Sequence, residues 1–199
     1  MNKNTTVDWS NYMREVCVGH LVKNSQQKIG GEGEIVEIDE SLFSKRKNHT
    51  GRILPQQWIF GGICRRTKKK FLVMVPDRSA KTLLAAIVAH IAPGSTIMSD
   101  SWRAYKTEEL EEAGYEHYKV NHRYNFLNPD DKEVHTQGVE RMWGSAKWRN
   151  KKQRGTKRDF MDTYLAEFMV REEMKADGVD PFDSIIEKIV AYWPPKEEL

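Results

Sequence analysis

The sequence predicts an α/β fold: a mixed five-stranded sheet flanked by helices, with a C-terminal helical extension. Two observations predict it. Segments with the two-residue alternation of strands are interleaved with segments whose apolar residues recur at helical spacing. Three consecutive strand segments precede the first internal helix, which is typical of an antiparallel meander. With 199 residues, 39% of them hydrophobic, the chain can bury one substantial core.

The first elements are a helix and a strand. Apolar side chains at helical spacing predict an amphipathic helix over residues 8–22, which the segment 28–33 ends. Residues 34–43 have the alternation of a strand, with Val36 on one face and Glu37 and Asp39 on the other. A rigid strand is thus expected to hold the carboxylate of Asp39.

The middle of the chain completes most of the sheet. After a charged loop at 44–56, strands are expected at 58–64 and 71–75, joined by a turn. Ser79 is a suitable N-cap for an apolar helix that Pro93 and Gly94 close. Residues 96–99 then form a short strand, so that Asp100 falls at a strand's C-terminal end, where α/β sheets commonly present functional groups.

The remaining elements are mainly helices. A helix through Leu110 stops at Gly114, a last strand covers 115–120, and the polar stretch 121–134 is a loop. A helix from Gln137 places Glu140, Trp143 and Lys147 on one face. Two further helices are marked by apolar residues at 160–168 and at 182–190.

Basic residues are concentrated in two stretches that contain no Asp or Glu. Residues 45–70 hold nine Lys and Arg, and residues 141–158 hold eight, of 32 in the chain. A polyanion is the natural partner of such patches. A solvated face or a nuclear address is the alternative for either stretch alone. The candidate DNA-binding residues are Lys45, Arg46, Lys47, Arg52, Arg141, Lys147, Arg149, Lys151, Lys152 and Arg154.

Other compositional features restrict the setting. No apolar run is long enough for a membrane span and no secretory leader is visible, so we expect an intracellular protein, nuclear if eukaryotic and cytoplasmic if bacterial. Cys17 and Cys64 have no partner at metal-binding spacing and are expected to be reduced and mostly buried.

Three carboxylates occupy positions that correspond to the acidic positions of one known fold. The order of elements matches the RNase H-like fold, in which acids come from the first strand, the fourth strand and a late helix. Asp39, Asp100 and Glu140 occupy those places here. Carboxylate oxygens are the ligands that hard divalent metals prefer. The three residues are therefore candidate ligands of a metal site.

Several segments resemble the catalytic domain of Merlin-type DDE transposases and their bacterial insertion-sequence relatives. They are EIVEIDESLFSKRK, QQWIFGGICRRT, FLVMVPDRSAKTLL, IMSDSWRAY, VNHRYNF and HTQGVERMW, in the order and spacing of the family. The resemblance implies that Asp39, Asp100 and Glu140 are the catalytic metal ligands, and that Lys147 is the lysine that typically follows the Glu on its helix.

The resemblance also implies an activity and an organisation. The expected activity is that of a DNA transposase, with metal-dependent phosphodiester cleavage followed by strand transfer at transposon ends. The expected cofactor is two Mg²⁺ or Mn²⁺ ions. Double-stranded DNA, as transposon ends and target, is the expected partner, and assembly on DNA as a homo-oligomer is expected. The expected ranges are an N-terminal helix and linker at 1–30, the catalytic domain at 31–176, and a C-terminal helix and tail at 177–199.

The sequence departs from the family pattern at two points. Longer family members carry a separate DNA-recognition module before this domain, whereas about 30 residues precede Glu34 here. Gly138 stands where Thr or Asn is usual, and glycine weakens a helix start by about 1 kcal/mol relative to alanine.

Each candidate residue has an alternative role. Glu37 or Glu40 could replace Asp39 as a ligand, and Asp100 could instead cap the following helix. Glu140 could pair with Arg141 or a lysine on the helix surface.

Nearby aromatic side chains also allow two interpretations. His122 and His135 could approach the metals or be structural, and Trp102 and Trp143 could stack on a base or pack beside the site. Two further functions remain open: a catalytically inactive DNA-binding protein derived from a transposase, and another RNase H-like nuclease such as a junction resolvase.

Overall fold

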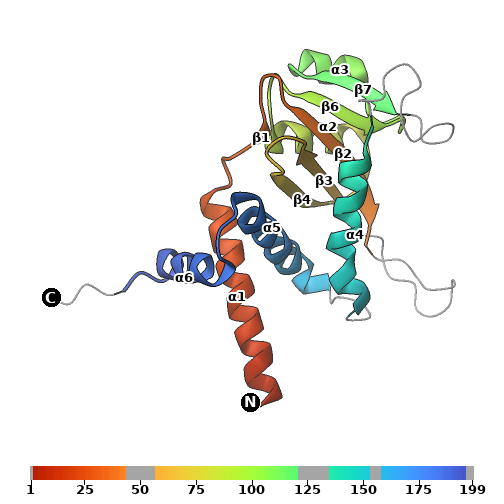
Figure 1. Cartoon of the computed structure of the whole chain (residues 1–199). Helices are drawn as coiled ribbons and strands as arrows, with labels where there is room; N and C mark the ends of the chain where they lie inside the picture. Colours follow the sequence, from red (N-terminus) through yellow and green to blue (C-terminus); the bar gives the residue numbers. More distant parts are fainter. Residues whose placement is uncertain (1, 44–56, 121–134, 153–157, 196–199) are drawn as a thin grey trace, which may run out of the picture. The chain divides into compact units, whose positions relative to one another are not determined.

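The computed structural model describes residues 2–43, 57–120, 135–152 and 158–195 (Figure 1). The chain divides into two compact units. The helical unit comprises Met1–Gln27 with Thr156–Leu199, and the sheet unit comprises Lys28–Gly155. The helical unit includes α5 (Met161–Asp177), most of which falls within the expected catalytic range 31–176, and α5 packs on the N-terminal helix α1 (Lys3–Lys23). The expected ranges 1–30, 31–176 and 177–199 stay a prediction.

The sheet unit contains the predicted mixed five-stranded sheet, in the order β4-β3-β2-β6-β7. Its strands are β2 (Ile35–Leu42), β3 (Trp58–Cys64), β4 (Lys70–Val75), β6 (Thr96–Asp100) and β7 (Glu116–Val120). Strands β2, β3 and β4 are antiparallel, whereas β6 is parallel to both β2 and β7. A short parallel pair of β1 (Ile29–Gly30) and β5 (Ile91–Ala92) was not expected from the sequence.

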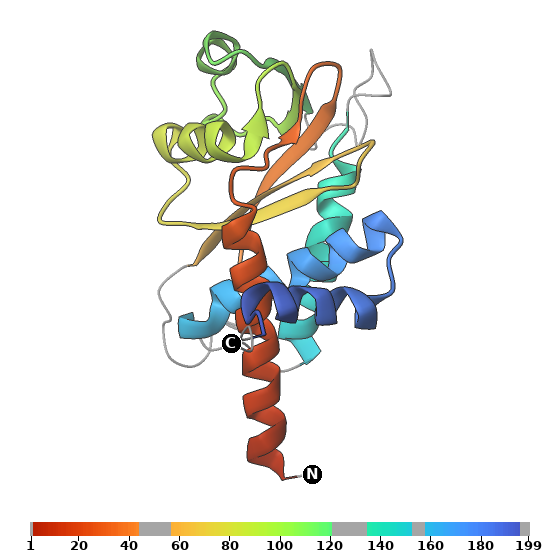
Figure 2. The ribbon, with the colours of Figure 1, turned by 90° about the vertical axis from the view of Figure 1, so that its left-hand side faces the viewer.

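The alternation along β2 separates a core face from a polar face. Val36 and Ile38 are fully buried and pack in one cluster with Leu83 and Ile87 of helix α2 (Ala80–His90). As predicted, the Ser79 side chain caps α2, accepting a hydrogen bond from the Thr82 backbone N–H. Helices α2 and α4 (Gln137–Lys152) lie on opposite sides of the sheet (Figure 2). The polar face of β2 therefore faces α4.

The segment after β6 leads into a short helix. Helix α3 (Thr107–Glu112) precedes Gly114, whose φ of 88° is a backbone conformation that glycine adopts readily. The predicted stop at Gly114 is thereby confirmed, and β7 begins two residues later.

The helical unit packs three helices around a small apolar cluster. Helix α1 contacts both α5 and α6 (Pro181–Tyr192), and a short 3₁₀ helix, η2 (Arg158–Phe160), precedes α5. The buried members of the cluster are Cys17, Ala166, Val170 and Met174. Cys17 and Cys64 are free and buried, as the sequence predicts. Among the described residues, no helix has the length and apolar character needed to span a membrane.

Candidate two-carboxylate site at the ends of the central strands

Asp39 and Asp100 come from neighbouring parallel strands. In the β2–β6 register Glu37 pairs with Met98, an offset of 61 residues, and the same offset separates Asp39 from Asp100. Residues in register on adjacent strands point to the same side of a sheet. The spacing seen in the sequence thus reflects the pairing of two strands, and it brings the two carboxylates together.

The pKa of Asp39 reflects this proximity. The pKa of Asp39 is raised from its ordinary value of 3.8 to about 7, first by burial and then by the negative charges of Glu40 and Asp100. A hydrogen bond of 2.9 Å from the Trp143 indole Nε1 to Asp39 Oδ2 acts in the opposite direction, because it favours the ionised form. Asp39 therefore lies in a site that disfavours its own charge.

The polar face of β2 is matched residue by residue to one face of α4. Glu37 accepts a hydrogen bond of 3.0 Å from the Val139 backbone N–H, and Asp39 accepts the one from Trp143. A third contact joins Lys147 Nζ to the Ser41 hydroxyl. We call these three contacts the β2–α4 ladder. Through these contacts, the face of α4 that carries Trp143 and Lys147 is turned toward β2.

Aromatic packing holds the middle of the ladder. Trp143 is 6% exposed, and its ring meets that of Phe43 edge to face at a centroid distance of 6.0 Å. The Lys147 ammonium lies 5.4 Å from the Phe43 ring centroid. Packing beside the site is thus the role of Trp143 in the structure, and its indole N–H is directed at a carboxylate.

Glu37 anchors the start of α4. Its side chain is 1% exposed and accepts a hydrogen bond of 2.7 Å from Arg65 Nε, as well as the one from Val139. Arg65 in turn donates to the His135 backbone carbonyl at 2.8 Å. A buried carboxylate at a helix N-terminus is stabilised by the helix dipole and by the guanidinium. These contacts exclude Glu37 as a replacement for Asp39 and give His135 a structural role.

Gly138 is required by the approach of Glu37. A Cβ atom at position 138 would lie 2.7 Å from Glu37 Oε2, closer than real Cβ contacts. The glycine that departs from the family pattern therefore makes room for the anchoring carboxylate at the first turn of α4.

Asp100 does not cap a helix. Its Oδ1 accepts a hydrogen bond of 2.9 Å from the Trp102 backbone N–H, whereas α3 begins only at Thr107 after Lys106. The alternative of a helix cap is wrong because the chain makes a turn at Asp100 first. This turn fixes one carboxylate oxygen.

Glu140 stands apart from the two aspartates in burial. It lies in the first turn of α4, three residues before Trp143 and on the same side of the helix, and it is exposed. Among the described residues, no group of three or more His, Cys, Asp or Glu side chains is arranged to hold a metal ion. The structure thus unites Asp39 and Asp100, and leaves Glu140 outside a three-ligand group.

The donor chemistry of the aspartate pair fits a divalent cation. Burial and the negative charges of Glu40 and Asp100 raise the pKa of Asp39, and a bound cation would relieve this repulsion. Glu140 would supply a third carboxylate from α4.

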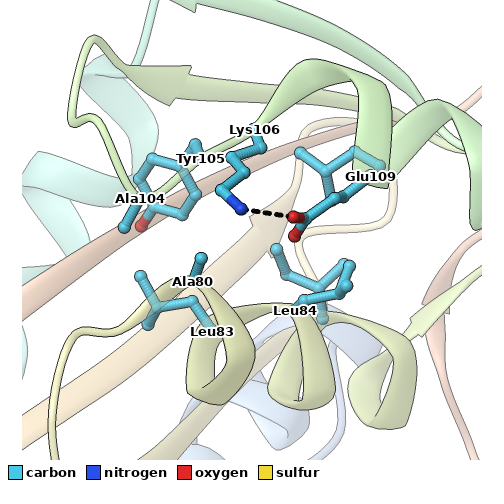
Figure 3. A pocket seen from close by; sticks show the side chains of 9 residues that line it. Ala80, Leu83, Leu84, Ala104, Tyr105, Lys106 and Glu109 are labelled. Atoms are coloured by element: carbon cyan, nitrogen blue, oxygen red, sulfur yellow. Dashed lines mark hydrogen bonds and ion pairs between the residues drawn. The ribbon is translucent and has the colours of Figure 1, made fainter.

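Glu40 lies close to the pair on the opposite face of β2. Its Oε2 accepts a hydrogen bond of 2.8 Å from the Tyr105 hydroxyl, and burial is the main cause that raises its pKa. Tyr105 also lines a pocket between α2 and residues 104–110, whose other lining side chains are mainly apolar (Figure 3). The Lys106–Glu109 ion pair forms part of that lining. Because its lining is mainly apolar and its two charged side chains pair with each other, we assign no catalytic role to this pocket.

The predicted DNA-binding residues fall mostly outside what the structure describes. Lys45, Arg46, Lys47, Arg52 and Arg154 lie outside the described residues, as does His122. Arg149, Lys151 and Lys152 lie on the backbone of α4, and their side chains are not described. Arg141 is exposed on α4, whereas Lys147 is half-buried against β2. Their roles in DNA binding stay predictions.

Sequence reasoning missed the groups that support the carboxylates. Arg65 lies 28 residues from Glu37, and Tyr105 lies 65 residues from Glu40. No local sequence pattern predicts either contact. The one available signal was the alternation of Glu37 with Asp39, which indicated a second buried acid on the polar face.

The chain is similar to two solved structures. The catalytic core domain of BIV integrase is 12% identical, with 80% of this chain and 97% of that chain covered and a TM-score of 0.50. A chain of the simian T-cell lymphotropic virus intasome is 16% identical, with 72% of this chain and 49% of that chain covered and a TM-score of 0.45. The likeness to the BIV integrase core and the five-stranded mixed sheet show an RNase H-like fold.

Sequence comparison gives the family. The chain belongs to the ISXO2-like transposase domain family, which matches residues 29–173. An uncharacterized transposase-like protein of Haemophilus influenzae is 27% identical over 99 residues, which are 50% of this chain and 76% of that protein. The predicted relation to DDE transposases is confirmed at this level.

Proposed function

We propose that the protein is a DNA transposase that cleaves phosphodiester bonds and transfers strands at transposon ends with the help of divalent metal ions. The observation that carries the proposal is the proximity of Asp39 on β2 to Asp100 at the end of β6, within an ISXO2-like transposase domain. The Merlin-type relation is the finer form of the same proposal.

Asp39, Asp100 and Glu140 would hold Mg²⁺ or Mn²⁺. Bound ions of this kind activate an attacking oxygen and stabilise the leaving oxygen of a phosphodiester. The chain's own contribution is positioning. The Trp143 indole and the Trp102 backbone N–H each fix one oxygen of an aspartate, so that both carboxylates are oriented before a substrate arrives.

The helix α4 links the carboxylates to the basic residues that follow them. Glu140 and Lys147 lie on the same helix as three predicted DNA-binding residues, Arg149, Lys151 and Lys152. The β2–α4 ladder fixes that helix against β2. Contacts of lysine and arginine with phosphates position a duplex without reading its sequence. A duplex held along α4 would place its backbone near the aspartate pair.

The test is cleavage by purified protein of supercoiled plasmid and of duplexes carrying candidate transposon ends, with Mg²⁺, with Mn²⁺ and with EDTA. We expect nicking with either metal, none in EDTA, and a loss of at least about 100-fold in Asp39→Asn, Asp100→Asn and Glu140→Gln. The surface variant Glu116→Gln on β7 is the matched control and should retain activity.

Three results would overturn the proposal in different ways. Cleavage that persists in all three carboxylate variants would show that another site acts. Salt-sensitive DNA binding without cleavage on any substrate would instead favour a catalytically inactive DNA-binding protein. Preference for branched junctions over linear ends would favour a junction resolvase.

A further inference from the structure

The Arg78 guanidinium contacts two indole rings near Glu40. Its guanidinium carbon lies 4.0 Å from the centroid of the Trp58 ring and 4.3 Å from that of the Trp102 ring. Trp58 begins β3, Trp102 follows β6, and Arg78 immediately precedes the N-cap of α2. We call this arrangement the Trp58–Arg78–Trp102 stack.

The stack lies at the same end of the sheet as the aspartate pair. Trp102 is the residue whose backbone N–H binds Asp100, at 2.9 Å. Trp58 pairs with Leu42 at the end of β2, three residues beyond Asp39. The positive charge of Arg78 also reaches Glu40, the acid next to Asp39 in sequence.

The edge of this guanidinium is unused. In the described part of the chain, Arg78 makes no hydrogen bond and no ion pair; its contacts are the two ring stacks and the longer-range attraction to Glu40. A guanidinium carries five N–H donors in its plane, and stacking covers its faces but leaves that edge open. A half-buried arginine with unpaired donors can therefore bind an acceptor that the described residues do not supply.

The charge of that acceptor follows from the surroundings. Asp39, Asp100 and Glu40 repel a polyanion, so a nucleic-acid strand needs a fixed cation close by. Arginine binds phosphate oxygens with two parallel hydrogen bonds. Because the indoles already restrict the side chain, less conformational freedom is lost when a phosphate binds.

We propose that the edge of the Arg78 guanidinium binds a backbone phosphate of the DNA strand that enters the Asp39–Asp100 site. The inference rests on the proposed function and adds to it a substrate contact outside both basic stretches of the sequence. Trp58 and Trp102 act as positioning residues in this role, because they hold the plane of the guanidinium.

A purely structural role makes a different prediction. If Arg78 only balances the charge of Glu40 and packs the two indoles, its removal lowers stability and leaves the salt dependence of DNA binding unchanged. If Arg78 instead contacts a phosphate, binding releases one more counterion from the DNA, and removal of Arg78 makes the affinity less dependent on salt.

The experiment measures binding of the full-length chain to a fluorescently labelled duplex by anisotropy, in EDTA, over a series of KCl concentrations. EDTA separates binding from cleavage. Arg78→Gln should weaken binding about 5- to 20-fold and reduce the slope of log affinity against log salt by about 0.9. Arg78→Lys keeps the positive charge but lacks the paired N–H donors of the guanidinium. It should have the wild-type slope of log affinity against log salt, but an affinity between those of wild type and Arg78→Gln.

Lys81→Gln is the matched control, because Lys81 is an exposed cation on α2 only three residues from Arg78. It should keep the wild-type slope. Thermal unfolding of each variant separates loss of fold from loss of contact.

The inference is overturned if Arg78→Gln keeps the wild-type slope, or if Lys81→Gln loses as much slope as Arg78→Gln. Failure of the proposed function looks different: the slope change at Arg78 would be present while cleavage is absent with every metal. A wild-type chain that does not bind DNA would overturn both.

Discussion

The indole Nε1–H of Trp143 donates a hydrogen bond of 2.9 Å to Oδ2 of Asp39, across 104 residues of sequence. A hydrogen bond to the ionised form of a carboxylate lowers its pKa. Here it offsets part of the opposing effect of burial and of two neighbouring acids. A side chain that packs α4 onto the sheet thereby also adjusts the charge of the site.

Trp143→Phe should move the pH dependence of metal binding upward. Phenylalanine retains most of the packing but removes the donor, so the pKa of Asp39 should rise above about 7. A hydrogen bond to a charged group contributes about 1.5 kcal/mol, which corresponds to a shift of about one pH unit. Titration of Mn²⁺ binding between pH 5 and 9 measures the midpoint. Trp148→Phe, at a 58% exposed position of the same helix, should leave it unchanged; equal midpoints for both variants would contradict the assignment.

Asp39→Asn should stabilise the metal-free protein at alkaline pH. The pKa of Asp39 is raised from 3.8 to about 7 on folding, so between these values the folded state binds more protons than the unfolded state. The free energy of unfolding therefore falls as pH rises through this window, and the full cost is present above pH 7. Because asparagine carries no charge, we expect a gain of about 1–3 kcal/mol at pH 8 and little or none at pH 4. Urea unfolding in EDTA at the two pH values measures it. A gain that is the same at both would show that charge is not its origin.

Gly138→Ala should destabilise the protein although alanine is the better helix former. The added methyl group would meet the Glu37 carboxylate at 2.7 Å, and overpacking of this kind costs about 1–3 kcal/mol. Gly144→Ala on the same helix is the control, because nothing lies within 4 Å of its Cβ position, and there a gain of up to about 1 kcal/mol is expected. Chemical unfolding of both variants gives the comparison. Equal changes in the free energy of unfolding at the two positions would mean that the Glu37 carboxylate does not lie against Gly138.

Glu37→Gln should cost far more than the same change at Glu34. Glu37 is 1% exposed and paired with Arg65, and loss of one partner of a buried pair costs about 3–5 kcal/mol. Glu34 pairs with Arg66, which is 75% exposed, and such pairs contribute about 0–1 kcal/mol. Urea unfolding at pH 7 distinguishes them, and a difference below about 1 kcal/mol would remove Glu37 as the anchor of α4.

Much of the sheet could be predicted because local periodicity encodes its strands, and the two aspartates could be predicted because the order of elements matches the RNase H-like fold. The alternation along β2 places Glu37 and Asp39 on one face, and the pattern after residue 137 gives the helix that meets that face. The pair β1–β5 could not be predicted, because two-residue strands have no period to detect. Nor could the partners of Glu37, since Arg65 and Val139 approach it only through tertiary folding. The approach of Glu140 to the aspartates likewise depends on how α4 packs against the sheet, which no local pattern encodes.

The β2–α4 ladder also restricts where the chain can change length. Its contacts repeat every two residues on the strand, at about 6.6 Å, and every four on the helix, at about 6.0 Å, so the two elements stay in step over three contacts. One residue inserted within Val139–Lys147 would turn everything beyond it by about 100° and direct those side chains away from the strand. Related chains should therefore differ in length outside 37–41 and 139–147, and an alignment of them can be anchored on these two segments.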